Sequence, residues 1–123
     1  LKAWQATGAE MWWYICCGPT HPYPNFFIDY PTIDSRVVSW LTWKYGKTGF
    51  LYWGVEYKGD PKEMTPDGPT ERYEVGPANM GNGDGALGYW GPDFSFTPSI
   101  RMNAIRDGIE DYELLALVKR RRR

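Results

Sequence analysis

Four carboxylates near the ends of predicted strands are the side chains best suited to catalysis or ligand binding in this sequence: Asp29, Glu56, Asp60 and Asp84. Hydrolysis of a glycosidic bond uses two carboxyl groups, or one carboxylic acid together with an acetamido group of the substrate. Glu56 is the sharpest candidate, because a carboxylate on an apolar strand is costly unless it serves a site or pairs with a cation such as Lys58. Asp84 lies between two glycines, where an aspartate is more often a turn former than a ligand-binding residue.

Aromatic side chains accompany these acids. They make up 17% of the chain, with seven Trp and nine Tyr. Aromatic rings can pack against the apolar faces of sugar rings, while carboxylates accept hydrogen bonds from sugar hydroxyls. We therefore predict a carbohydrate-binding site lined by His21, Tyr23, Trp53, Glu56, Tyr57 and Asp84. The alternative is that most aromatic residues inside the strands belong to the core.

Individual roles follow from the predicted positions of these residues. Trp53 would stack on the sugar face and Glu56 would accept hydrogen bonds from ring hydroxyls, with His21 and Tyr23 on the opposite wall. Trp53 and Glu56 are three residues apart, so on a regular strand they point to opposite faces. A bulge at Gly54 would bring them to the same side.

Other site chemistries have little support. The sequence contains neither a G-x-S-x-G nucleophile elbow nor a glycine-rich phosphate loop. Zinc needs about four ligands, and only His21 lies near the adjacent pair Cys16 and Cys17. We expect two reduced thiols in a strand, one facing each way, with a vicinal redox switch as the alternative. The redox compartment is left open.

The elements that must position these residues begin with two apolar segments, residues 10–17 and 49–57. Both are apolar on both faces, as in strands of parallel α/β sheets. With a helix between them they make a βαβ unit with a parallel pair. The loops that follow these strands, residues 18–31 and 58–84, hold the polar and aromatic candidates. A short third strand is predicted at residues 86–90.

Two helices are predicted, over residues 33–45 with Thr32 as N-cap, and over residues 99–119 after an N-cap and first-turn pair, Thr97 and Pro98. The predicted stripe of the first helix contains Ile33, Val37, Trp40, Leu41 and Lys44. The predicted buried face of the second contains Met102, Ile105, Ile109, Tyr112 and Ala116. The acids of the second helix are expected to form structural ion pairs, including an i,i+4 pair of Arg106 with Glu110: Asp107, Glu110 and Asp111.

These elements are too few to close a sheet around a core. A (β/α)8 barrel needs about 250 residues and places its chemistry on the loops after the strands. We therefore predict an α/β fold that is the C-terminal third of a (β/α)8 TIM-type barrel. Residues 1–123 are expected to be a partial barrel domain excerpted from a longer chain, ending in a basic tail at residues 119–123.

Composition excludes some partners. The net charge of −1 gives no global attraction to nucleic acid, and no apolar run reaches the roughly 18 residues of a membrane span. The basic tail suits the C-terminal end of a helix dipole, with a nucleic-acid-binding arm as the poorer alternative.

Several segments together resemble a known family. They are Trp12-Trp-Tyr-Ile-Cys-Cys-Gly-Pro-Thr-His-Pro-Tyr-Pro-Asn-Phe-Phe-Ile-Asp-Tyr-Pro31, Trp43-Lys-Tyr-Gly46, Gly49-Phe-Leu-Tyr-Trp53, Asn82-Gly-Asp-Gly85, Pro98-Ser-Ile-Arg101 and Ile105-Arg-Asp-Gly-Ile-Glu-Asp-Tyr-Glu113. These residues resemble the C-terminal part of the glycoside hydrolase family 123 catalytic domain, over nearly the whole chain.

The resemblance implies a (β/α)8 barrel with β-N-acetylgalactosaminidase-type activity on glycans that contain N-acetylhexosamine. It implies a retaining, substrate-assisted mechanism, in which an Asp orients the acetamide and an adjacent Glu protonates the leaving oxygen, without a metal or organic cofactor. The adjacent Asp-Glu pair is expected on an earlier strand, and here the only adjacent acids, Glu110 and Asp111, have the opposite order. No catalytic residue is therefore carried over, and the chain alone is expected to be inactive.

Two functions remain open at this point. The first is a hydrolase segment that supplies sugar-binding residues and needs the remainder of its own barrel as a partner. The second is a non-catalytic carbohydrate-binding or scaffold module.

Overall fold

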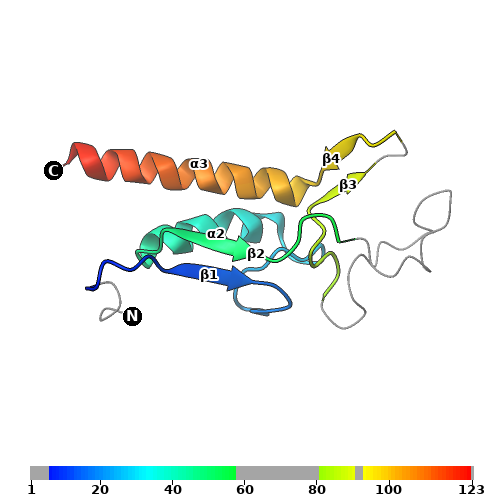
Figure 1. The fold of residues 1–123 in the computed structure, drawn as a ribbon, viewed down its shortest axis with the longest axis horizontal. Helices are drawn as coiled ribbons and strands as arrows, with labels where there is room; N and C mark the ends of the chain where they lie inside the picture. The colour runs from blue at the N-terminus through cyan, green and yellow to red at the C-terminus, as the bar shows by residue number, and fades with distance from the viewer. Residues whose placement is uncertain (1–5, 58–80, 91–92, 123) are drawn as a thin grey trace.

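The computed structural model describes residues 6–57, 81–90 and 93–122. These residues form a mixed α/β structure around a parallel two-stranded sheet (Figure 1). The elements in chain order are β1 (Trp12–Ile15), α2 (Thr32–Lys44), β2 (Gly49–Tyr52), β3 (Gly88–Trp90), β4 (Phe96–Pro98) and α3 (Ile100–Arg121).

The predicted βαβ unit is confirmed. β1 and β2 pair in parallel, with Trp12 opposite Gly49 and Ile15 opposite Tyr52, and α2 connects them. Each strand has four residues, fewer than the predicted segments 10–17 and 49–57. β1 stops early because the amide of Cys16 turns back to the carbonyl of Gly18, at 3.1 Å. β2 stops because the following residues pair with a different segment, described below.

The two faces of the β1–β2 sheet differ in burial, although both carry apolar side chains. Ile15 and the partly buried Phe50 and Tyr52 lie on one face, which contributes to a core cluster of Ile15, Phe26, Val38, Leu87 and Ile105. The other face carries Trp12, Tyr14 and Leu51, which are 55%, 59% and 47% exposed. Among the described residues, only the first face is packed.

The N-cap and the buried face predicted for α2 are wrong. Thr32 is the first residue of the helix, which is preceded by Pro31 without a side-chain cap. Two members of the predicted stripe, Ile33 and Trp40, are 51% and 44% exposed. The buried side chains are instead Ser35, Val38, Ser39 and Thr42.

The reason is the close approach of α3, which lies alongside α2 (Figure 1). A Cβ added to Gly108 of α3 would lie 2.5 Å from the carbonyl oxygen of Arg36. The two helices are therefore close at this crossing, and the side chains buried on α2 include the small residues Ser35 and Ser39, which the predicted stripe did not contain.

α3 is close to the predicted helix of residues 99–119, with a different cap. Ser99, not Thr97, is the N-cap, and its hydroxyl accepts a hydrogen bond from the Met102 amide at 3.2 Å. Thr97 belongs to β4. Ile105 is buried as predicted, whereas Ile109 is 47% exposed. Arg101 and Gly108 complete the buried face.

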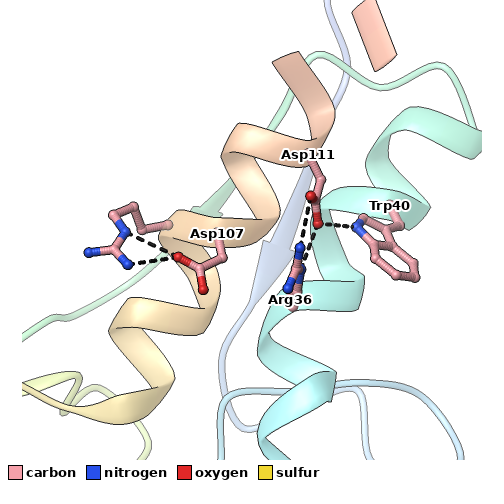
Figure 2. Close-up of polar contacts among 5 residues, drawn as sticks. Arg36, Trp40, Asp107 and Asp111 are labelled. Carbon is pink, nitrogen blue, oxygen red and sulfur yellow. Dashed lines mark hydrogen bonds and ion pairs between the residues drawn. The ribbon is translucent and has the colours of Figure 1, made fainter. Parts of the chain in front are cut away.

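The predicted ion pairs of α3 are confirmed. Asp111 binds Arg36 of α2 through two hydrogen bonds of 2.6 and 2.9 Å and accepts a third from the Trp40 indole at 2.7 Å (Figure 2). These bonds from Arg36 and then Trp40 lower the pKa of Asp111 to about 2. Arg106 contacts Asp107 at 2.8 Å and Glu110 at 3.8 Å.

The predicted third strand is present as β3, with three residues. β3 forms an antiparallel hairpin with β4, with Tyr89 opposite Thr97, and β4 was not predicted. Among the described residues, β3 does not extend the β1–β2 sheet. A Cβ on Gly88 would clash with the ring of Phe96 on the paired strand, so the glycine makes room for this ring. In the part of the chain that the structure describes, no helix combines the length and apolar sequence of a membrane span.

Candidate functional site

The glycine-rich turn at residues 81–86 is the centre of the candidate site. Gly83 and Gly85 have positive φ angles of 81° and 77°, a backbone conformation that favours glycine. A Cβ on Gly83 would lie 2.6 Å from the Ile28 side chain, and one on Gly85 would lie 2.5 Å from the Trp53 ring. The turn therefore packs tightly against the loop after β1 and the segment after β2.

Asp84, between these glycines, is fully buried. Its Oδ1 accepts hydrogen bonds from the Tyr52 hydroxyl and from the Trp53 indole N–H, each at 2.9 Å. Its Oδ2 is buried and has no hydrogen-bond partner among the described residues. Sequence reasoning selected Asp84 while favouring a turn-forming role, and the structure gives the residue both the turn and a buried carboxylate.

Tyr52 fixes the carboxylate from the end of β2. Its hydroxyl donates to Asp84 and accepts from the Gly85 amide at 2.6 Å. Burial is the main cause that raises the pKa of the Tyr52 phenol far above its ordinary value. The hydrogen bond to Asp84 raises this pKa further. The phenol therefore stays protonated and acts as a donor to Asp84 at neutral pH.

The segment after β2 forms the second side of the site. Tyr57 donates its amide to the Gly85 carbonyl at 2.8 Å, and the Leu87 amide donates to the Val55 carbonyl at 2.7 Å. Glu56 forms an antiparallel bridge with Ala86 and is exposed. The rings of Trp53 and Tyr57 lie 5.1 Å apart, at an angle of 57°. The chain thus leaves β2 at Trp53, so the strand alternation assumed for Trp53 and Glu56 does not apply.

Arg101 links the glycine-rich turn to the loop after β1. Its guanidinium is buried, with 4% of the residue exposed, and donates to the carbonyls of Phe26, Gly83 and Ala86. Sequence reasoning missed this residue. The available signal was a cation in the first turn of α3, where the helix dipole disfavours positive charge unless another interaction compensates.

Asn25 holds the loop after β1 in the same way, and was also missed. It is fully buried, and its amide nitrogen donates to the carbonyls of Cys16 and Pro19, at 2.9 and 2.8 Å. Farther along, the Ile28 amide donates to the Asn82 carbonyl at 2.8 Å. The loop after β1 and the glycine-rich turn are therefore neighbours, as expected for loops at the same edge of parallel strands.

The remaining predicted residues lie on this loop. The His21 ring stacks on Tyr30, with centroids 3.9 Å apart, and its amide donates to the Tyr30 hydroxyl at 3.0 Å. Tyr23 is 63% exposed. The structure brings Trp53, Tyr57 and Asp84 into one cluster, with Glu56 on the adjoining bridge, whereas the contacts of His21 are with Tyr30.

The other sequence candidates contribute less. Asp29 accepts a hydrogen bond from the Asn82 side chain at 3.4 Å. Asp60, Lys58 and most of the predicted loop 58–84 fall outside the described residues. Within residues 6–57, 81–90 and 93–122, no group of three or more His, Cys, Asp or Glu side chains could hold a metal ion.

This arrangement combines a buried, hydrogen-bonded carboxylate with two neighbouring aromatic rings. A comparison with protein families gives a match to the model described as glycoside hydrolase 123, catalytic domain, over residues 1–118. No curated protein matches the chain.

Proposed function

The chain belongs to the glycoside hydrolase 123 catalytic domain family, and on this premise we propose that it forms part of the carbohydrate-binding site of a glycoside hydrolase. The observation that carries the proposal is the buried Asp84 carboxylate. One oxygen is held by Tyr52 and Trp53, and the other has no partner among the described residues. A buried acceptor without a partner is costly, and the hydroxyl of a sugar is a donor that would satisfy it.

The proposed substrate is a glycan with a terminal N-acetylhexosamine. Trp53 and Tyr57 stack on the sugar ring, while Asp84 and Glu56 accept hydrogen bonds from its hydroxyls. His21 and Tyr23, on the neighbouring loop, form the opposite wall. The hydrogen bond between Ile28 and Asn82 supports this proximity of the two loops.

The catalytic pair in this proposal lies outside the chain. Glu110 and Asp111 are the adjacent acids of the sequence, and Asp111 is occupied by Arg36 and Trp40 between α2 and α3. We propose a retaining, substrate-assisted mechanism whose Asp-Glu pair is supplied by an earlier part of the same barrel.

The barrel itself is part of the proposal. A parallel βαβ unit is the repeating unit of a (β/α)8 barrel, in which the helices cover the outer face of the strands. α2 packs on the face that carries Ile15, so Trp12, Tyr14 and Leu51 belong to the inner face of the proposed barrel. Their exposure supports the idea that further strands of the barrel surround them.

The test measures hydrolysis of an aryl 2-acetamido-2-deoxy-β-galactoside by the full-length protein and by residues 1–123 alone. We expect turnover by the full-length protein and none by the shorter chain. Asp84→Asn should lower kcat/KM about tenfold or more, equivalent to about 1.4 kcal/mol, and Asp107→Asn on α3 should leave it unchanged. Sugar binding without turnover by the full-length protein would instead identify a non-catalytic module.

A further inference from the structure

Two cysteines at the carboxyl end of β1 lie outside the proposed sugar chemistry. Cys16 and Cys17 are the only cysteines of the chain, and both are free thiols, with Cys17 exposed and Cys16 partly exposed. Their sulfur atoms lie 3.6 Å apart and share a hydrogen bond. Both thiols are thus on the same side of the backbone. The expectation that they lie in a strand and face opposite ways is wrong, because β1 ends at Ile15 and the regular alternation of a strand ends with it.

The local backbone explains this departure. The Cys16 amide donates to the Gly18 carbonyl at 3.1 Å, and the Cys16 carbonyl accepts from the buried Asn25 side chain at 2.9 Å. Asn25 also binds the Pro19 carbonyl at 2.8 Å. Both polar groups of the Cys16 backbone are therefore fixed, and the two thiols are held together before any ligand arrives.

The geometry distinguishes between the possible partners of such a pair. A disulfide needs sulfurs about 2.05 Å apart and Cα atoms usually 4.4–6.8 Å apart, whereas adjacent Cα atoms are about 3.8 Å apart. A structural zinc site needs about four ligands, and the described residues offer no group of three. A pyramidal centre that binds two sulfurs, with bonds of about 2.3 Å and angles of about 95–105°, needs sulfurs roughly 3.4–3.6 Å apart, close to the observed 3.6 Å.

We propose that Cys16 and Cys17 form a preorganised dithiol site for a trivalent arsenical, which bridges the two sulfurs. With an organoarsenic(III) oxide the reaction is a condensation: two S–H bonds and the arsenic–oxygen double bond break, two arsenic–sulfur bonds form, and one water molecule leaves. No atom changes oxidation state. The site is independent of the proposed glycosidase function.

The test titrates the folded full-length protein with phenylarsine oxide and identifies the adduct by intact mass and peptide mapping. We expect one arsenical on the peptide containing both cysteines, with loss of two titratable thiols. The adduct should resist excess glutathione and be removed by ethanedithiol. Cys16→Ser and Cys17→Ser should each lower the apparent affinity about a hundredfold or more, because each variant loses the second, intramolecular bond.

Two control experiments accompany the titration. Thermal melting of both serine variants checks that the fold survives. Titration in urea tests preorganisation: affinity should fall when the chain unfolds and the contacts of Asn25 are lost. The proposal is overturned if either single variant binds the arsenical as tightly as the wild type, or if the unfolded chain binds it equally well.

Discussion

The indole N–H of Trp53 donates to the buried carboxylate of Asp84 at 2.9 Å, across 31 residues of sequence. The Tyr52 hydroxyl donates to the same oxygen at the same distance. This arrangement joins the end of β2 to the glycine-rich turn and holds an aromatic ring beside a carboxylate. The stability and the binding behaviour of the protein should both depend on it.

Removal of the Asp84 side chain should destabilise the fold. Asp84→Ala leaves two partly buried donors, on Tyr52 and Trp53, without their acceptor, and we expect a loss of about 1–3 kcal/mol in the free energy of unfolding. Urea unfolding of the purified protein measures it. Glu113→Ala, at an exposed carboxylate of α3, is the control. Equal stability of the Asp84 variant and the wild type would show that the hydrogen bonds of this carboxylate contribute nothing net.

Tyr52 should make stability depend on alkaline pH. Its pKa in the folded state is raised above the ordinary value of 10.0, so the unfolded chain loses this proton first as the pH rises. The contribution of the protonated phenol is therefore fully present below about pH 10 and is lost above it. Tyr52→Phe should show a weaker fall in melting temperature between pH 9 and 11 than Tyr45→Phe, an exposed tyrosine. Parallel curves for the two variants would contradict the assignment.

A side chain at Gly85 should destabilise the fold because it would clash with Trp53. The same substitution at Gly8 separates this clash from the strain of a positive φ angle. Gly85 and Gly8 have nearly equal positive φ angles, 77° and 78°, so alanine strains the backbone similarly at both. A Cβ at position 85 would also lie 2.5 Å from the Trp53 ring, whereas one at position 8 meets no atom within 4 Å. Gly85→Ala should cost about 1–3 kcal/mol more than Gly8→Ala in chemical unfolding. Equal losses in the free energy of unfolding for the two variants would mean that the Trp53 side chain moves aside without an energetic penalty.

The contact between Asp111 and Arg36 should stabilise the α2–α3 pair in a pH-dependent way. The pKa of Asp111 is lowered from 3.8 to about 2, chiefly by its hydrogen bond with Arg36. Its contribution is present above pH 3.8, where the unfolded chain is also ionised, and is lost as the pH falls through about 2. The difference in melting temperature between wild type and Asp111→Asn should therefore shrink over this range. A constant difference would exclude an ionic contribution.

The sequence predicted those parts of the fold that depend on the pattern of apolar residues within a single segment. The apolar segments around Ile15 and Phe50 predicted the parallel βαβ unit, because parallel strands lie close to the core and need a helical crossover. The buried face of α2 was not readable. It depends on how closely α3 approaches α2 at Gly108, a residue of another helix, and it includes Ser35 and Ser39, which an apolar stripe does not mark.

The residues of the candidate site also divide into those that the sequence predicted and those that it did not. Trp53 and Asp84 could be selected by residue type and by their places after strands. Arg101 offered one indirect signal, a cation in the first turn of α3, and Asn25 offered none, because the partners of both side chains are backbone carbonyls, which leave no mark in side-chain patterns. The Phe26 carbonyl, for example, is 75 residues from Arg101.

Sugar binding by a matched pair of tryptophan variants tests the central claim most directly. Trp53 donates its indole N–H to Asp84, and Trp40 donates its own to Asp111, so the two residues make the same kind of bond at different places. Equilibrium binding of N-acetylgalactosamine to the full-length protein is measured for Trp53→Ala and Trp40→Ala, after melting curves show that both variants are folded. We predict that Kd rises about tenfold or more for Trp53→Ala and stays at the wild-type value for Trp40→Ala. An unchanged Kd for Trp53→Ala would return Trp53 to a purely structural role and contradict the account.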